Sequence, residues 1–541
     1  MFYKPSIIFF IKVTNEIIMK KPIKVIDIFS GPGGLGEGFS NYKNDDNKNA
    51  FKIAISIEME KSAHRTLTLR AFYRQFLGKP PKEYYEFLQG NLGETPEEQL
   101  YKLPKFRKQV EAAQDEAQQL ELGKDNKVID ERIANAIGKD ECILIGGPPC
   151  QAYSMAGRSR NAGNKEYKAE KDHRNFLYKE YLKIIANNQP MLFVMENVKG
   201  MLSAKINGEY IYESIFADLK EPNKTLKIIP TTNRHSHKYK IFSFVTPINN
   251  EEHITPKDFI IKSEYYGVPQ NRHRVILLGI REDLAANWHN DYILKPQAPI
   301  SVNTVLQDLP PLRSGLSKDN NTNENWLKQI IDNASNTIKA LKRISQDDIA
   351  NEFQKTVRNL TVPDNGQGKN FAQKRIGTIK NIELKKWFKD KNLDNHICNH
   401  QTRGHLTADL QRYLFCSTWS KVGIRNNWSS TTPKSKDYPE ELAPNHKNFS
   451  TGKFADRFRV QSENKPATTI TSHISKDGHY FIHPDPLQCR SLTVREAARI
   501  QTFPDNYFFV GNRTQQYVQV GNAVPPLLAF KLASVVDKII S

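Results

Sequence analysis

The chain has 541 residues, which at about 150 residues per domain predicts three or four domains and excludes a single small one. Hydrophobic residues make up 38% and charged residues 25%, a composition that excludes collagen-like, disulfide-scaffold and wholly disordered proteins. Lys and Arg number 78 against 59 Asp and Glu, so the net charge is +19. This excess favours a polyanionic partner, because each neutralised phosphate releases condensed counterions. Nucleic acid is therefore the leading partner, and an anionic membrane surface is the alternative.

Cysteine content and apolar runs indicate the compartment. The five cysteines are too few and too scattered for a disulfide framework, which predicts a reducing, intracellular environment. The apolar run at residues 7–11 ends at Lys12, far short of the roughly 20 residues that a membrane span needs. We expect residues 1–18 to be an N-terminal extension ahead of Met19, with no membrane segment, and the protein to be cytoplasmic.

Up to residue 280 the chain alternates apolar runs of strand length with helical patterns. The predicted strands are residues 23–29, 51–57, 141–145, 191–195 and 274–280. Such alternation predicts an α/β fold with a mostly parallel sheet covered by helices. Residues 105–140 have the pattern of a charged helical insertion.

The pattern changes after Arg281. Polar, Asn-rich stretches follow without regular alternation, which predicts a domain boundary there. Near Arg490 a helical pattern returns, and the chain closes with an amphipathic stretch at residues 525–540.

A glycine-rich turn follows the first predicted strand. Gly31, Gly33 and Gly36 match G-x-G-x-x-G, and Glu58 ends the next strand about 20 residues further on. Glycines allow close approach of a ligand to the backbone, and a carboxylate at this place can accept hydrogen bonds from both ribose hydroxyls. The motif predicts an adenosine-bearing cofactor, without separating a nicotinamide dinucleotide from S-adenosylmethionine.

Cys150 lies just beyond a predicted strand, in GGPPCQAYS. Free cysteines are usually small buried hydrophobes, and Cys142, inside the strand, fits that description. A thiol at the carboxyl end of a strand in an α/β fold instead faces the ligand crevice, where a lowered pKa makes a thiolate nucleophile available.

Three charged residues accompany two other strands. Glu196 ends the strand at 191–195, where a carboxylate is either a solvated strand end or, beside a nucleophilic cysteine, a proton donor to a substrate ring nitrogen. Arg272 and Arg274, in QNRHRV, are either surface charges or, on one face of an entering strand, ligands for a phosphate and a base carbonyl.

Six segments in this order resemble the DNA (cytosine-5) methyltransferase family. They are DIFSGPGGLGEGF, GGPPCQAYS, ENV, QNRHRV, RSLTVREAARIQTFPD and QVGNAVPP. The resemblance implies a Rossmann-like S-adenosylmethionine-dependent methyltransferase domain formed discontinuously by residues 19–280 and 490–541. Residues 281–489 would form an irregular target recognition domain with a smaller sheet, which reduces the expected number of domains to two.

The resemblance also implies a cofactor site for S-adenosylmethionine, with S-adenosylhomocysteine as product. Asn91 is assigned there as the counterpart of an Asp that ends the third strand in the family and contacts adenine, because an Asn carbonyl accepts the same bond. The residues expected at the site are Phe29, Gly31, Gly33, Glu58, Met59, Asn91, Leu177, Asn522 and Ala523.

The implied reaction is methylation of C5 in a flipped-out cytosine of a specific double-stranded DNA sequence, through a covalent bond between Cys150 and C6. Glu196 would stabilise protonated N3, Arg274 would hold O2, and Arg272 would support a phosphate or the active-site loop. The loop 151–164, with Arg158 and Arg160, is either a lid over the flipped base or solvated surface.

The resemblance further implies a bacterial modification enzyme, monomeric and associated with the nucleoid through DNA. Its partner would be a cognate restriction endonuclease encoded as a separate chain. We expect no metal, because Cys398, His400 and His405 lack the paired spacing of zinc ligands.

Three alternatives remain at this point. An RNA (tRNA) cytosine-5 methyltransferase shares the catalytic motifs, but that branch has a short recognition region. A nicotinamide-dependent oxidoreductase explains the glycine turn and leaves the other motifs unused. A non-catalytic DNA-binding homologue conflicts with the joint presence of Cys150, Glu196, Arg272 and Arg274.

Overall fold

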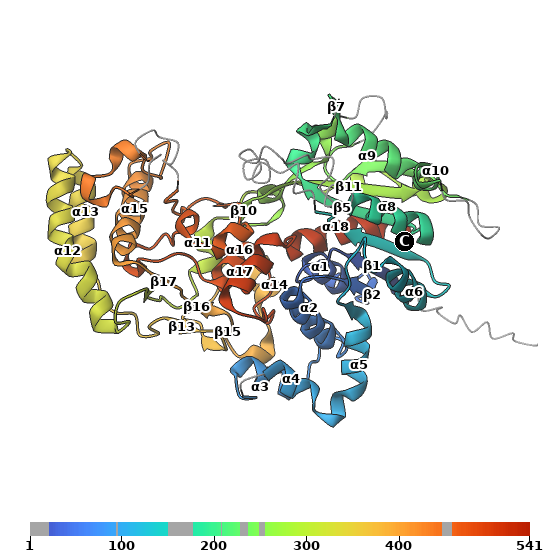
Figure 1. Cartoon of the computed structure of the whole chain (residues 1–541), viewed down its shortest axis with the longest axis horizontal. Helices are drawn as coiled ribbons and strands as arrows, with labels where there is room; N and C mark the ends of the chain where they lie inside the picture. Colours follow the sequence, from blue (N-terminus) through green and yellow to red (C-terminus); the bar gives the residue numbers. More distant parts are fainter. Residues whose placement is uncertain are drawn as a thin grey trace, which may run out of the picture.

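The computed structural model describes residues 21–93, 96–149, 177–206, 208–227, 236–247, 255–445, 449 and 457–541. The predicted extension at residues 1–18 lies outside this part of the chain. Figure 1 shows a body built around a sheet and, at the left, a lobe of long helices. Among the described helices, none is long and apolar enough to cross a membrane.

An eight-stranded sheet forms the centre of the body. Its main order is β3-β2-β1-β4-β5-β11-β8, and β9 also pairs with β11. The pairs from β3 to β5 are parallel, whereas β11 is antiparallel to β5, β8 and β9. The strands are β1 (Ile23–Ile28), β2 (Phe51–Ile57), β3 (Ala117–Gln118), β4 (Cys142–Gly146), β5 (Leu192–Val198), β8 (Tyr239–Ser243), β9 (Ile260–Lys262) and β11 (His273–Arg281). The α/β prediction is confirmed, and β1, β2, β4, β5 and β11 are the five predicted strands.

Helices cover both faces of the sheet, because alternate strand residues point to opposite sides. Val25 belongs to the core shared with α1 (Gly34–Asn41) and α18 (Pro526–Ile540). Ile26 belongs to the core shared with α6 (Asn126–Ile137), α8 (Leu177–Asn188) and α9 (Ile211–Lys220). The last helix of the chain therefore completes the layer begun by the first.

The segment 105–140 is more than a helical insertion. It contains α5 (Arg107–Glu116), β3 and α6, and β3 extends the sheet beside β2 through Ser56 and Ile57. A strand of two residues is too short to give a recognisable pattern. The preceding helices are α2 (Lys61–Arg74), α3 (Lys82–Gln89) and α4 (Pro96–Tyr101).

The region 281–489 contains a helical lobe that its polar texture concealed. Here α12 (Asn323–Arg343), α13 (Asp347–Arg358) and α15 (Thr407–Arg425) share a core of their own. On α12 the buried Trp326, Ile330 and Ala334 recur every four residues among polar neighbours.

Short ladders and helices connect the lobe to the body. Four two-stranded ladders pair β10 (Gln270–Asn271) with β18 (Ala467–Thr468), β12 (Gly315–Leu316) with β17 (Gly404–His405), β13 (Gly368–Lys369) with β16 (His400–Gln401), and β14 (Gln373–Lys374) with β15 (His396–Ile397). The other short elements are β6 (Lys205–Ile206), β7 (Glu209–Tyr210), α10 (Pro222–Leu226), α11 (Val302–Leu306) and α14 (Ile382–Phe388).

Buried arginines of α16 (Val494–Ile500) and its flanks join the two regions. The Arg499 guanidinium, wholly buried, bonds to Asp505 at 2.6 Å and to Asp308 at 2.9 Å. Because Asp308 precedes the helical lobe and Arg499 follows it, this contact fixes both ends of the inserted region. The next helix is α17 (Arg513–Asn522).

Asp27, in the middle of β1, is a buried carboxyl group without a matching charge. Its side chain is fully buried, and neither oxygen has a hydrogen-bond partner among the described residues. Arg74 is the cation that lowers the pKa of Asp27 most, but its guanidinium is hydrogen-bonded to Glu116. Burial, only partly offset by Arg74, raises the pKa of Asp27 to about 7.

Replacing Arg499 by Ala is expected to lower the free energy of unfolding by about 3–5 kcal/mol, because two buried carboxylates are left facing only Arg375. Urea unfolding followed by circular dichroism measures the change. The control, Arg107→Ala, removes an exposed pair with Glu111 and should cost about 0.5 kcal/mol or less. Equal losses in the two variants would contradict the role of Arg499.

Asp27→Asn is expected to flatten the dependence of stability on pH. The folded pKa is raised above the unfolded value of 3.8, so the wild-type protein loses stability as pH rises from about 4 to about 7. The slope from this one group is at most about 1.4 kcal/mol per pH unit. Unfolding between pH 5 and 8 checks the prediction, with exposed Asp45→Asn as control; equal pH dependence in wild type and Asp27→Asn would refute it.

Candidate active site

The glycine turn after β1 has a backbone that few residue types adopt. Gly31 and Gly33 have φ of 56° and 94°, and Phe29, half-buried, has φ of 54°. A Cβ atom on Gly33 would lie 2.8 Å from Leu67 and 3.0 Å from the hydroxyl of Tyr507. A Cβ atom on Gly31 would meet no atom within 4 Å, so the turn is packed on one side and open on the other.

Glu58 connects the end of β2 to this turn. Its carboxylate accepts hydrogen bonds from the amide of Gly31 at 2.8 Å and of Glu60 at 2.7 Å. Burial raises the pKa of Glu58, and these backbone bonds oppose the shift. A carboxylate has about four acceptor positions, so about two remain for ribose hydroxyls. The free acceptor positions of Glu58 fit the hydroxyls of an adenosine ribose. Met59, beside it, is 59% exposed.

The C-terminal segment reaches the same turn. A Cβ atom on Gly34 would lie 2.2 Å from the carbonyl oxygen of Val524, so the two backbones are in contact. Asn522, exposed, ends α17, and the amide of Gln501 holds the carbonyl of Ala523 at 3.3 Å. Asn522 and Ala523 directly precede Val524, so they lie close to the turn that contains Gly31 and Gly33.

Tyr507 is a residue of this site that sequence reasoning missed. The Tyr507 hydroxyl donates to the carbonyl of Pro32, inside the turn. The guanidinium of Arg495 donates to the backbone carbonyl of Tyr507 at 2.6 Å. The signal was its place two residues after FPD in a segment already associated with the cofactor domain.

The structure bears differently on two other residues predicted for the cofactor site. Asn91 follows helix α3 and bonds to Gln89 at 3.2 Å, whereas the third strand of the sheet is β3. The premise that Asn91 ends a strand is therefore wrong. Its local sequence resembles the family segment, but it follows a helix and not a strand. Leu177, half-buried, begins α8, and the residues just before it lie outside the described part of the chain.

Glu196 and Arg274 form an ion pair at the carboxyl end of β5. Arg274 Nε lies 2.8 Å from Glu196 Oε1, and the side chains are 16% and 13% exposed. Antiparallel pairing of β5 with β11 sets Val198 opposite Arg274, which brings the two charged residues together. Arg274 Nη1 bonds to the His273 carbonyl, and Nη2 has no partner among the described residues.

The turn that leads to Cys150 packs against the Glu196 side chain. A Cβ atom on Gly147 would lie 3.0 Å from Glu196 Oε2, and Asn197 donates to the carbonyl of Pro148 at 3.2 Å. Cys150 itself and the loop 151–164, with Arg158 and Arg160, lie outside the described residues. Asn197 was not singled out from the sequence, although it stands inside the ENV motif.

The side chain of Arg272 is buried and does not face the edge of the sheet where Glu196 and Arg274 lie. Its side chain is 2% exposed, and Nη1 donates to the carbonyls of Ile470 at 2.7 Å and Gly521 at 3.3 Å. Burial, with Arg274 nearby, lowers the pKa of Arg272. This placement is incompatible with a phosphate contact, because the guanidinium faces backbone oxygens rather than solvent. Arg272 instead holds the start of β11 against the end of α17.

The four described cysteines are buried thiols with raised pKa values. Burial raises the pKa of Cys142, Cys398 and Cys416 to about 12 and raises that of Cys489 as well. Such thiols are poor nucleophiles near neutral pH.

The cluster of Cys398, His400 and His405 is held by protein groups. The Cys398 thiol donates to the Leu88 carbonyl, His400 lies between Thr493 and the Pro310 carbonyl, and His405 contacts Tyr413 and Ser491. Among the described residues, no group of three or more potential ligands could hold a metal ion.

Comparison with known proteins agrees with these motifs. Residues 117–226 and 253–538 match the family described as C-5 cytosine-specific DNA methylase. The chain is 31% identical over 540 residues to the type II methyltransferase M.Bpa9945I of Bacillus paralicheniformis, covering 96% of this chain and 99% of that protein. It is 25% identical to the putative type II methyltransferase M.OihORF3336P of Oceanobacillus iheyensis, over 96% of each. It is 24% identical to the DNA (cytosine-5-)-methyltransferase M.ApeKI of Aeropyrum pernix, over 74% of this chain and 82% of that one.

The family match covers β3, β4, β5, β9 and β11 of the sheet and the C-terminal segment that contacts the glycine turn. The relative with 31% identity matches along nearly its whole length. The chain therefore belongs to the C-5 cytosine-specific DNA methylase family and is a DNA (cytosine-5-)-methyltransferase.

Proposed function

We propose that this enzyme methylates C5 of a flipped-out cytosine in a specific double-stranded DNA sequence, as the modification enzyme of a restriction-modification system. The observation that carries the proposal is the Glu196–Arg274 pair against the turn that leads to Cys150. This pair and the turn before Cys150 share the carboxyl edge of the sheet with the glycine turn and Glu58. In open α/β sheets, ligands bind at this edge.

The methyl donor in this proposal is S-adenosylmethionine, which supplies an electrophilic methyl group when bound. Gly31 and Gly33 would hold it against the open side of their turn, with Phe29 and Ala523 beside it. Glu58 would accept hydrogen bonds from the ribose with its remaining acceptor positions. Exposed Met59 is available to adenine.

Cytosine C5 is a poor nucleophile, so the ring must be activated before methylation. The Cys150 thiolate attacks C6 while Glu196 stabilises the proton on N3, which gives an enamine that is nucleophilic at C5. After C5 has accepted the methyl group, loss of the C5 proton and elimination of Cys150 restore aromaticity. The raised pKa values of the four buried cysteines support the choice of Cys150 as the nucleophile.

Arg274 has two tasks in this mechanism. Its Nε fixes the Glu196 carboxylate, and Nη2 is available to hold O2 of the cytosine. Because C6 is approached from the face of the ring, the base must leave the duplex, at a cost of a few kcal/mol.

The alternatives fare less well. The family match removes the nicotinamide oxidoreductase. The relative with 31% identity, which includes the recognition region in its match, is named a type II methyltransferase, and this favours DNA over RNA. A monomeric state, association with the nucleoid and a separate endonuclease remain predictions.

Cys150→Ser is expected to reduce methyl transfer to below about a thousandth of wild type, because a hydroxyl is a far weaker nucleophile than a thiolate. Bisulfite sequencing of DNA from expressing cells identifies the site, and tritium transfer from the cofactor to that duplex measures the rate. DNA affinity should stay close to wild type. Near wild-type turnover in this variant would disprove the covalent mechanism.

Glu196→Gln is expected to lower kcat by about 10²–10⁴-fold, because an amide cannot supply a proton to N3. Cofactor affinity, measured by calorimetry, should change little, since Glu58 and the glycine turn hold the donor. Glu209→Gln, at an exposed position, is the matched control. A variant that loses cofactor affinity and keeps kcat would place Glu196 in the wrong site.

A further inference from the structure

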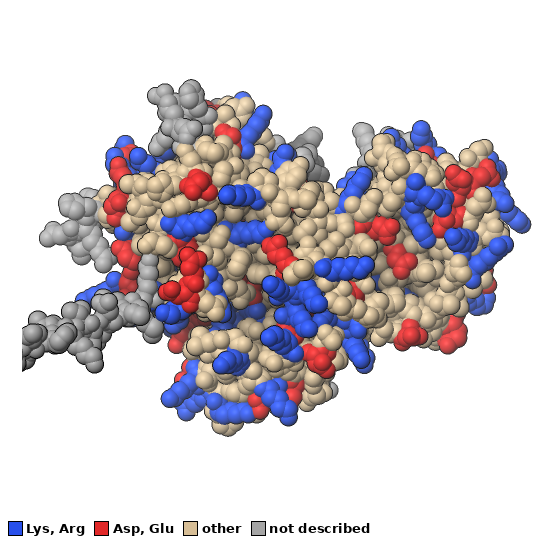
Figure 2. All heavy atoms as spheres, turned by 180° about the vertical axis from the view of Figure 1, so that it is seen from behind, with Lys and Arg blue, Asp and Glu red and all other residues tan. Residues whose placement is uncertain are grey.

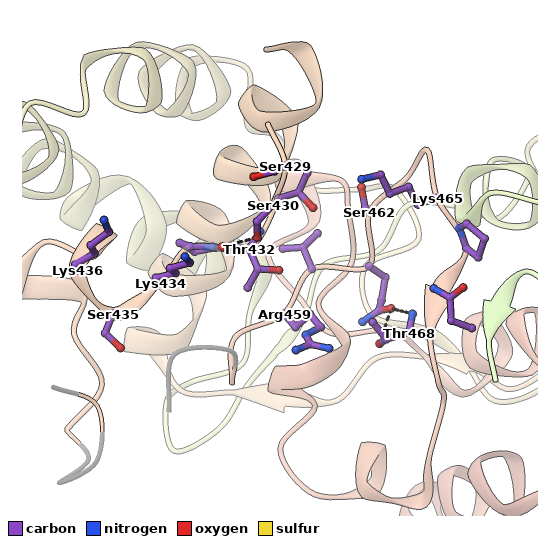
Figure 3. A pocket seen from close by; sticks show the side chains of 16 residues that line it. Ser429, Ser430, Thr432, Lys434, Ser435, Lys436, Arg459, Ser462, Lys465 and Thr468 are labelled. Atoms are coloured by element: carbon purple, nitrogen blue, oxygen red, sulfur yellow. Dashed lines mark hydrogen bonds between the residues drawn. The ribbon is translucent and has the colours of Figure 1, made fainter. Parts of the chain in front are cut away.

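A groove of about 850 Å³, lined by many hydroxyl and lysine side chains, lies beside the end of the helical lobe. One wall is the segment 429–436, which follows α15, and the other is the segment 459–468. In Figure 3, Ser429, Ser430 and Thr432 lie opposite Ser462 and Thr468. The polar side chains of the lining are Asn271, Ser429, Ser430, Thr431, Thr432, Lys434, Ser435, Lys436, Arg459, Gln461, Ser462, Lys465 and Thr468.

The polar atoms of Gln461, in the lining of the groove, are hydrogen-bonded within the protein. The amide of Gln461 donates to the Tyr480 carbonyl at 2.7 Å, and its oxygen accepts from the backbone and hydroxyl of Thr468 at 2.9 and 3.1 Å. Gln461 is only 1% exposed, and both its amide nitrogen and its oxygen are bonded within the protein. It is therefore not placed to bind the edge of a DNA base, although Gln is a side chain that reads adenine.

The rim of the groove is cationic. Lys434, Lys436 and Lys465 are exposed, form no ion pair with a described carboxylate, and share the lining with Arg459 but with no Asp or Glu. Nearby Asp437 accepts from the backbone amide of Lys434. The hydroxyl of Ser435 is buried and has no partner among the described residues. Ammonium and hydroxyl groups together are typical ligands of phosphate oxygens.

The groove opens beside the reaction edge. Asn271 lines it, pairs with Thr468 in the β10–β18 ladder and lies three residues before Arg274. Seen from behind in Figure 2, Lys and Arg are spread over both lobes and gather near the middle, where the lobes join.

We propose that this groove clamps the sugar-phosphate backbone of the DNA substrate and does not read bases. The proposal rests on the proposed function and adds where the duplex backbone is held and by which side chains. Three lysine ammonium groups without an ion pair to a described carboxylate and several hydroxyls line the groove. The one glutamine of the lining, Gln461, is buried and hydrogen-bonded within the protein. Asn271 and Arg459 are lining side chains with base-reading chemistry, so the test leaves them intact.

The test measures binding of the full chain to two labelled 30-bp duplexes between 50 and 200 mM KCl. One duplex carries the site found by bisulfite sequencing, and the other is a scrambled sequence of equal composition. The clamp variant is Lys434→Gln, Lys436→Gln and Lys465→Gln combined. The control, Lys48→Gln, Lys127→Gln and Lys139→Gln combined, removes three exposed lysines outside the groove.

The clamp predicts that the slope of log affinity against log salt falls by about 0.9 for each phosphate that is no longer neutralised, thus by about 2–3 in the clamp variant. Affinity at 100 mM KCl should fall at least about tenfold, equally for both duplexes, so site preference stays as in wild type. The control variant should keep the wild-type slope. Equal thermal midpoints show that all variants are folded; a single substitution at Lys434 replaces the triple if the triple unfolds.

Two results overturn the clamp: a slope equal to that of the control, or a loss of site preference at unchanged slope, which means base reading. Failure of the proposed function looks different. A wild-type protein that binds both duplexes but transfers no methyl group to DNA refutes the function, while a lowered slope in the clamp variant still supports the groove as a backbone site.

Discussion

Three buried guanidinium groups connect segments that lie far apart in the sequence. Arg490 bonds to Glu496, Arg499 bridges Asp308 and Asp505, and Arg495 donates to three backbone carbonyls. Burying a guanidinium is costly unless nearly every N–H finds an acceptor, so these contacts permit only one arrangement of the segments around them. One of the carbonyls held by Arg495 belongs to Tyr507, whose hydroxyl reaches the glycine turn. Arg495 thus connects Cys398, in the region 281–489, to the glycine turn through Tyr507.

The core of the sheet also joins the N-terminal and C-terminal parts of the chain. The N-terminal part supplies the sheet and the glycine turn, but the face covered by α1 is completed only by α18. Arg272, buried between Ile470 and Gly521, attaches the start of β11 to both returning segments. The groove and the Glu196–Arg274 pair are therefore positioned by one continuous framework, because β10, next to β11 in the chain, pairs with β18.

Much of the site could be predicted from sequence, because strand ends and glycine turns leave local signals. The spacing of Gly31, Gly33 and Glu58 predicts a glycine turn followed by a carboxylate at the end of the next strand. Glu196 follows a clear apolar run that predicts a strand. Long-range packing left no such signal. Arg272 and Arg274 are alike in sequence, yet one is buried against backbone carbonyls and the other pairs with Glu196. The misassignment of Asn91 has the same origin, since β3 is too short to reveal itself.

The reversed direction of β11 has a consequence for how such enzymes change. Its start lies at the reaction edge, whereas its end, Arg281, pairs with Glu141 at the opposite edge, where β4 begins. The chain thus leaves the sheet after Arg281 at the edge opposite the Glu196–Arg274 pair. The helical lobe of α12, α13 and α15 has its own core, whereas Asp308 and Ile470 on either side of it are held by Arg499 and Arg272. Changes confined to that lobe therefore leave these contacts in place. Sequence change in that lobe is therefore compatible with an unchanged Glu196–Arg274 pair.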